Sequence, residues 1–422
     1  MNFMKSILIG IVIFLGTLSA FGQNNQGTPY SRYGIGLLPD NYGSYTAMGG
    51  VYAAMRDNYN VNFLNPASYT ALDSMRFYFQ LGVTGEYVDI STSKEDTDYQ
   101  IAQNASINMA MRLYKKLFLS FGFNEKSDIG YDLYYNNNVN GDPSMIYLKH
   151  LEGEGGLNEA YLGLAYSLGK LSIGVNTALL FGKMEERQTL QILPATNGYY
   201  LKTRTQTHLH DVLFTIGAQY PLTLSDKSLL TLGTVFNFGT KLSGKQTFEA
   251  YKISNTSGIT TTINNEEWEK GHVLFPFKLT VGGAYTYVQK WLFAGDYTYQ
   301  RMSHYKEFGE GQEFKDYHHA ALGVSYCPNE NGRYWWQRNK YMAGAYFTKS
   351  HINLQNKDIN TFGGTLGSQI PLQTTRQELL LGIAFDFGVR GTHDKNLLLE
   401  KYAKVRINVA FKEIWFMKRK IF

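Results

Sequence analysis

The sequence predicts an all-β protein, a 14-stranded antiparallel transmembrane β-barrel. Three observations support this fold: an export signal at the amino terminus, long stretches in which apolar and polar residues alternate, and a composition with 15% aromatic residues and 42 glycines. The mean hydropathy is −0.28, and no apolar run after the signal reaches the roughly 20 residues that a membrane-spanning helix needs. The sequence therefore excludes a helical membrane protein and favours a barrel with aromatic girdles.

Residues 1–22 have the three parts of a secretory signal peptide. Lys5 supplies a positive charge, Ile7 to Leu18 form an apolar run, and the small residues Ala20 and Gly22 surround a cleavage point before Gln23. An uncleaved membrane anchor is the alternative, but the apolar run is too short to span a bilayer as a helix. No cysteine stands directly after the cleavage point, so we do not expect a lipoprotein.

Residues 76–422 carry the alternation expected of barrel strands. Between Leu171 and Gly182 the odd positions are mostly bulky and apolar, whereas the even positions are mostly small or polar, and Leu379 to Gly388 and Val405 to Phe411 repeat this pattern. A soluble β-sandwich also alternates, but its strands are typically about 5 or 6 residues long, whereas many of these stretches are at least twice that length. The predicted strands cover residues 76–92, 98–114, 117–134, 157–168, 171–192, 199–220, 229–250, 272–288, 291–305, 316–327, 340–353, 361–370, 376–388 and 401–411.

The connections alternate between tight turns and long polar loops, as in outer-membrane barrels. The longest expected loops are Asn136 to Gly156 and Ser254 to Gly271. The last strand leads into Trp415 and Phe416 and a basic tail that ends at Phe422. We expect these aromatic residues to form the signal that the outer-membrane insertion machinery reads, and the basic residues from Lys412 to Lys420 to anchor the periplasmic rim at lipid headgroups.

Residues 23–75 break the alternation, and here the sequence resembles a known family. A small-residue stretch, Ala47-Met48-Gly49-Gly50, precedes Asn65-Pro66-Ala67. This arrangement resembles the N-terminal hatch of the FadL-type outer-membrane transporters of hydrophobic compounds. Further segments that resemble the family are Leu274 to Pro276, Asp296-Tyr297, and Phe385 to Thr392 with Lys412 to Lys420, the last two being similar to the ending of members from Bacteroidetes-type bacteria.

The resemblance implies three parts: a signal peptide at 1–22, a hatch inside the lumen at 23–75, and the barrel at 76–422. A lumen enclosed by 14 strands is too wide for wall side chains alone to fill. Small residues would let the hatch backbone approach the wall, and Pro66 would fix a turn where the chain leaves the lumen. The residues that we assign to the hatch and the substrate path are Tyr30, Arg32, Tyr33, Gly49, Gly50, Asn65, Pro66 and Ala67.

Strand 3 is where the resembling family interrupts its sheet to open sideways. Here an apolar stretch ending at Phe123 is followed at once by polar residues, among them Asn124, Lys126 and Ser127. Such residues cannot all face lipid without a large free-energy cost. We therefore expect a kink or an inward fold at this point, with simple extension of the strand above the membrane as the alternative.

The sequence contains no recognisable catalytic or metal-binding constellation. His318 and His319 are adjacent, so on a strand they point to opposite faces, and Cys327 is the only cysteine. No phosphate-binding loop, nucleophile elbow or zinc spacing occurs. The net charge of +5 is spread along the chain, which gives no reason to expect nucleic acid. We expect no cofactor, no metal and no enzymatic activity.

Two functions follow from the resemblance. The first is a channel for passive uptake of hydrophobic, fatty-acid-like molecules through a hatch-gated barrel. The second is a non-transporting accessory subunit of an outer-membrane assembly (BAM-type) or type 9 secretion machine, because the long loops lack the apolar face of a fatty-acid capture groove. The expected partners are outer-membrane lipids and lipopolysaccharide, the BAM machinery during insertion, a hydrophobic ligand and other envelope proteins.

Overall fold

The computed structural model describes residues 27–37, 43–92, 96–139, 142–193, 198–373 and 377–415. The expected signal peptide at 1–22 and two expected assembly-signal residues, Phe416 and Phe422, lie outside the described residues.

Among the described residues, no helix is both long and apolar enough to cross a membrane.

The strands form one closed antiparallel sheet, because β1 pairs with β18 along its whole length, from Arg76 opposite Ile414 to Ser91 opposite Leu399. The strands are β1 (Arg76–Ser91), β2 (Asp96–Tyr114), β3 (Leu117–Val139), β4 (Asp142–Leu168), β5 (Leu171–Leu193), β6 (Tyr199–Ser225), β7 (Ser228–Asn237), β8 (Thr240–Ser254), β9 (Thr260–Phe275), β10 (Lys278–Tyr287), β11 (Trp291–Gln300), β12 (Lys306–Glu307), β13 (Glu310–Gly311), β14 (Tyr317–Tyr326), β15 (Lys340–Leu354), β16 (Lys357–Gln373), β17 (Gln377–Gly391) and β18 (Leu399–Ile414).

Within the described part of the chain, the wall has 14 strands, which confirms the predicted fold. The strand β7 continues as β8 after a short break, β9 continues as β10, and β12 and β13 form a small hairpin in a loop. The short helical segments are η1 (Pro29–Arg32), η2 (Gly43–Met48), η3 (Pro66–Ala71), η4 (Met302–His304), α2 (Trp335–Arg338) and η5 (Asp394–Asn396).

The alternation seen in the sequence corresponds to the two faces of the wall. In β5 the side chains of Leu171, Ile173 and Val175 are exposed on the outside, whereas Ser172 and Asn176 are buried on the lumen side. Apolar residues therefore face outward and small or polar residues face inward, as in an outer-membrane β-barrel. This arrangement also confirms the expected outer-membrane location.

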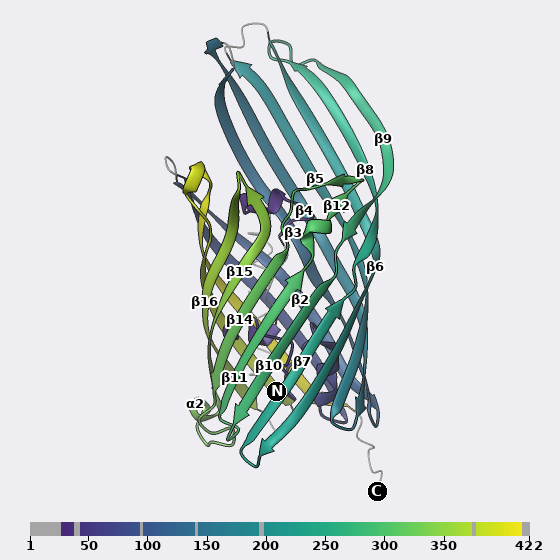
Figure 1. The fold of residues 1–422 in the computed structure, drawn as a ribbon, viewed down its shortest axis with the longest axis vertical. Coiled ribbons are helices and arrows are strands. Elements are labelled where there is room, and N and C mark those ends of the chain that lie inside the picture. Colours follow the sequence, from purple (N-terminus) through teal and green to yellow (C-terminus); the bar gives the residue numbers. More distant parts are fainter. Residues whose placement is uncertain are drawn as a thin grey trace, which may run out of the picture.

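The prediction of the two longest loops is wrong. Residues 142–156 are the first part of β4, and residues 260–271 belong to β9. Together with β3, β5, β6 and β8 these strands rise above the rest of the barrel as a one-sided extension (Figure 1). The sequence pattern missed them because water contacts both faces of the sheet there, so the chain no longer alternates in hydropathy although the strands continue to pair.

Aromatic side chains outline the membrane-facing band. Phe123 on β3 and Phe181 on β5 lie 6.3 Å apart, and charged side chains such as Lys183 follow immediately above them. At the opposite end Trp415, one of the expected assembly-signal residues, stacks on Phe77 with 4.2 Å between ring centroids. Aromatic residues concentrate at both membrane interfaces of such barrels, so the one-sided extension stands outside the hydrocarbon region.

Candidate functional site

The segment before β1 lies inside the closed sheet; we call residues 27–37 and 43–75 the lumen segment. The Gln369 amide on β16 donates a hydrogen bond to the Ser44 carbonyl at 2.8 Å, and the Asn176 amide on β5 donates to the Phe63 carbonyl at 2.8 Å. These two wall strands are far apart in the order of the sheet. Contacts with such distant strands require the lumen segment to pass through the barrel interior.

At Gly49 the backbone of the lumen segment lies close to the backbone of the wall, which explains why a small residue occurs there. Its amide donates a hydrogen bond to the Thr365 hydroxyl at 2.8 Å, and its φ is +72°. A Cβ on Gly49 would lie 2.8 Å from the Ala345 carbonyl oxygen, and one on the wall residue Gly344 would lie 2.2 Å from the Gly49 nitrogen. Gly50 also has a positive φ, of +81°. A side chain at either contact position would therefore push the lumen segment away from β15.

Asp296 on β11 is an anchor that the sequence analysis did not identify as such. One carboxylate oxygen accepts hydrogen bonds from the amides of Tyr52 and Ala53, at 2.6 and 2.8 Å. The residue is only 6% exposed. Its signal in the sequence is a lone carboxylate on the small, inward face of an alternating strand, which needs a partner inside the barrel.

The predicted Asn65-Pro66-Ala67 motif begins the helical turn η3. The Asn65 side chain caps this turn by accepting from the Ala67 amide at 3.1 Å, and it donates to the Ala53 carbonyl at 2.5 Å. Pro66 occupies the first position of the turn, where a missing N–H leaves no unsatisfied donor. Asn65 and Ala67 are fully buried. The motif therefore connects two parts of the lumen segment and packs against the wall.

Lys412 corrects one expectation about the basic C-terminal stretch. Instead of reaching lipid headgroups, its side chain is 4% exposed, and its ammonium lies 2.8 Å from the Asp73 carboxylate and 3.1 Å from that of Glu378. It also donates to the Asn58 carbonyl at 3.3 Å. Lys412 has the inward phase of β18, so the alternation itself could have predicted that it differs from the residues after it.

Residues 27–37 cross the upper part of the lumen from β18 to β3. The Thr28 hydroxyl donates to Glu400, whose carboxylate is also paired with Arg390 at 3.0 Å. The Tyr30 hydroxyl donates to the Leu398 carbonyl at 2.5 Å, so Tyr30 contacts the wall. At the other end, Leu37 forms an isolated antiparallel β-bridge with Asp128 on β3.

That bridge lies beside a separation of two wall strands. Among the described residues, β2 and β3 pair only from Tyr114 opposite Leu117 to Ser106 opposite Asn124. Above this point β2 continues along β1, and β3 continues along β4. Strands β2 and β3 therefore stop pairing at the level where the sequence of β3 becomes polar.

The three residues expected at a strand-3 kink have different positions. Asn124 and Ser127 are buried toward the interior, and the β3–β4 register shifts between Glu125 and Ser127. The Lys126 ammonium lies 3.1 Å from the Glu159 carboxylate on β4. Strand β3 itself remains one strand through this irregularity, from Leu117 to Val139.

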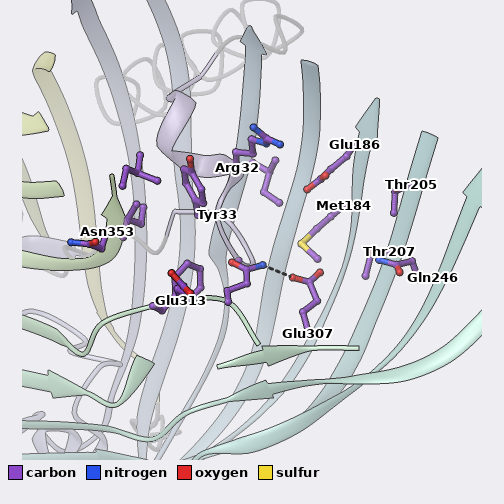
Figure 2. Close-up of a pocket in the computed structure, with 16 residues that line it drawn as sticks. Arg32, Tyr33, Met184, Glu186, Thr205, Thr207, Gln246, Glu307, Glu313 and Asn353 are labelled. Atoms are coloured by element: carbon purple, nitrogen blue, oxygen red, sulfur yellow. Dashed lines mark hydrogen bonds between the residues drawn. The ribbon is translucent and has the colours of Figure 1, made fainter. Parts of the chain in front are cut away.

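A cavity of about 660 Å³ lies where the lumen segment meets the extension. Arg32 and Tyr33 of the lumen segment line it, together with the carboxylates of Glu186, Glu307 and Glu313 (Figure 2). Burial and the neighbouring Glu186 charge raise the pKa of Glu307 from 4.5 to about 7. Three carboxylates near one guanidinium make this cavity suited to polar or cationic groups and unfavourable for a fatty-acid carboxylate.

The sequence is similar to a family model described as BamG over residues 3–422. Similar solved structures include a FadL homologue of Pseudomonas aeruginosa (11% identity, 90% of this chain and 99% of that chain, TM-score 0.65). The toluene transporter TodX of Pseudomonas putida is 16% identical (90% and 100%, TM-score 0.56), and the monoaromatic hydrocarbon channel CymD is 13% identical (90% and 99%, TM-score 0.56).

No curated protein matches the sequence. At these identities the structural neighbours establish a shared FadL-type barrel fold and nothing further. Two of these structural neighbours are named as a channel and a transporter, and neither is named as an enzyme. The match to the family model covers nearly the whole sequence, and on that basis the chain belongs to the BamG family.

Proposed function

We propose that this chain is a closed accessory barrel of a BAM-type outer-membrane assembly machine. In this proposal residues 23–75 are a permanent plug and residues 76–422 are the barrel. The observation that carries it is the attachment of the lumen segment to several sides of the wall by buried polar groups. The match to the BamG family model supports the same proposal through the family's name.

Three sets of charged contacts fasten the plug: Asp296 with the Tyr52 and Ala53 amides, Glu400 with Thr28, and Lys412 with Asp73. A hydrogen bond to a charged group contributes about 1.5–3 kcal/mol, so breaking all three sets would cost on the order of 6 kcal/mol. A micromolar ligand has a total binding free energy of about 8 kcal/mol. Such a ligand would have to use most of that free energy to displace the plug.

The one-sided extension gives such a subunit a surface outside the membrane. Its outer face carries a network in which the Glu185 carboxylate contacts Lys183 at 2.8 Å, Arg187 at 2.7 Å and Arg204 at 2.7 Å. Charged groups in this density belong in water or at a polar interface. A tall, charged sheet on one side of a closed barrel is suited to contact another envelope protein.

The second candidate is hatch-gated uptake of a hydrophobic small molecule. It is favoured by the separation of β2 and β3 above Ser106 and Asn124 and by the shared fold with the hydrocarbon channels. A molecule entering near the extension would then leave sideways between these strands. The carboxylates of the 660 Å³ cavity argue against a fatty acid as that molecule.

Gentle purification of the native protein from membranes, with lipid extraction of the same sample, separates the two candidates. The proposal expects envelope proteins in fixed stoichiometry and no specifically bound hydrophobic compound. A monomeric barrel that carries one defined hydrophobic ligand would contradict the proposal and favour uptake. An Asp296→Ala variant serves as a control for the plug, because it should keep its partners if the plug only closes the lumen.

A further inference from the structure

Among the described residues, the upper edges of β2 and β3 face each other across an open space above the level of Asn124. Residues 96–103 of β2 pair with β1 on one side, and most of residues 125–139 of β3 pair with β4 on one side. In the described chain, β2 and β3 have no ladder between them above Ser106 and Asn124. We call this space the β2–β3 notch. It presents backbone donors and acceptors from two strand edges.

The lumen segment closes only the base of the notch. The Leu37 amide donates to the Asp128 carbonyl at 2.9 Å, and the Asp128 amide donates back at 3.1 Å. The Ser31 hydroxyl donates to the Gly130 carbonyl at 3.1 Å. Above Gly130, a cavity of about 350 Å³ remains between the beginning of β2 and the upper part of β3.

The cavity of the notch lies beyond the acyl chains of the membrane. The outward aromatic residue of β3 at the membrane boundary is Phe123, and the notch begins one residue later, at Asn124. The cavity is lined by β3 residues from Asp132 to Tyr134, several residues farther from the membrane at about 3.3 Å per residue. The cavity of the notch thus lies outside the membrane on the side of the extension, where polypeptides have access.

The chemistry of the lining specifies the occupant further. Asp96, Asp98 and Asp132 contribute carboxylates, the last of them 2.6 Å from the His150 ring, and the described residues that line this cavity include no basic side chain. On the exposed edge of β3, Tyr134 is 75% exposed and Tyr135 is 47% exposed. Exposed strand edges pair with added strands, and pockets beside such an edge select the side chains of the added peptide.

We propose that the β2–β3 notch binds an extended, lysine- or arginine-containing polypeptide segment of a partner protein as an added β-strand. Backbone hydrogen bonds to β2 and β3 would provide affinity, and the three aspartates would select basic side chains. This inference rests on the proposed function for the source of the partner. Its test uses a synthetic peptide, so it can fail while co-purification with envelope proteins succeeds, and the reverse.

The probe is a fluorescent nonapeptide of alternating lysine and valine, added to the purified full-length protein in detergent. Hydrogen exchange should slow at amides 96–101 and 132–138 when the peptide binds, because both edges gain hydrogen bonds. A peptide of the same charge with N-methyl groups on alternate residues lacks half of its donors and should bind at least tenfold more weakly. A glutamate-valine peptide should not bind.

The matched variant replaces Asp96, Asp98 and Asp132 by asparagine, which keeps size and the surface position while removing charge. It should bind the lysine peptide at least fivefold more weakly, with unchanged heat-dependent migration on gels as evidence of folding. Equal binding of the N-methylated peptide, protection at other amides, or no peptide binding would overturn the proposal. Protection of the same amides by lipopolysaccharide vesicles or by self-association, without competition from the peptide, would also overturn it.

Discussion

Replacing Asp296 by alanine should release the middle of the plug while leaving the barrel folded. The variant loses two hydrogen bonds to a charged acceptor, from the Tyr52 and Ala53 amides at 2.6 and 2.8 Å. Each contributes about 1.5–3 kcal/mol, but removal of a buried carboxylate also relieves its desolvation. We therefore expect a net loss of roughly 2–4 kcal/mol in local stability.

Hydrogen exchange at the Tyr52 and Ala53 amides measures this loss directly. A loss of this size corresponds to exchange that is roughly 30-fold to 700-fold faster, at 1.4 kcal/mol for each factor of ten. Asp296→Asn keeps one acceptor oxygen and should give a smaller increase. The adjacent Tyr297 is outward-facing and 45% exposed, so Tyr297→Phe is the control. Unchanged exchange in Asp296→Ala, or an equal increase throughout the barrel strands, would refute the reasoning.

Three further predictions concern the plug and the cavity. Gly49→Val should loosen the plug by about 3 kcal/mol, because residue 49 has a positive φ and a side chain there would clash with the wall. The plug of this variant should be more sensitive to protease. Gly85→Val is the control and should not have this effect, because a Cβ at residue 85 meets no atom within 4 Å. The pKa of Glu307 is raised to about 7, so the folded state binds more protons than the unfolded state between pH 4.5 and 7, and stability falls as pH rises through this window. Glu307→Gln should therefore raise the melting temperature at pH 8 and not at pH 5; a gain at both pH values would count against this carboxyl as the cause. Lys412→Met leaves the Asp73 and Glu378 carboxylates without this cation. It should lower the free energy of unfolding by about 1–3 kcal/mol, measured from the urea midpoint. An unchanged midpoint would mean that the buried ammonium is not an anchor.

The strands within the membrane could be predicted from the sequence because lipid and lumen impose opposite requirements on successive residues. Leu171, Ile173 and Val175 face outward, and Ser172 and Asn176 face inward, as the alternation predicted. The upper parts of β4 and β9 could not be predicted in this way, because water contacts both of their faces. Pairing partners, rather than hydropathy, determine these strands.

The site was only partly predictable for a related reason. Gly49 and Asn65 stood out as unusual residues in a segment without alternation, and the structure places both against the wall. The wall residues that hold the segment, such as Asp296 and Glu400, are single polar positions on strands far apart in sequence. Only the closed sheet brings them together. Whether Phe422 and Phe416 act as an assembly signal stays a prediction.

The central claim is that the plug never needs to move, and a disulfide between plug and wall tests it most directly. A Cβ on Gly367 would lie 2.6 Å from the Cβ of Ala47, so a shift of about 1 Å would give the Cβ separation of a disulfide. Ala47→Cys and Gly367→Cys would be combined with Cys327→Ser, and each single cysteine would be the control. The locked protein should keep its partners and support growth equally with and without reductant. Loss of growth or of hydrophobic-compound uptake that reductant restores would show that the plug is a moving gate, and would contradict the account.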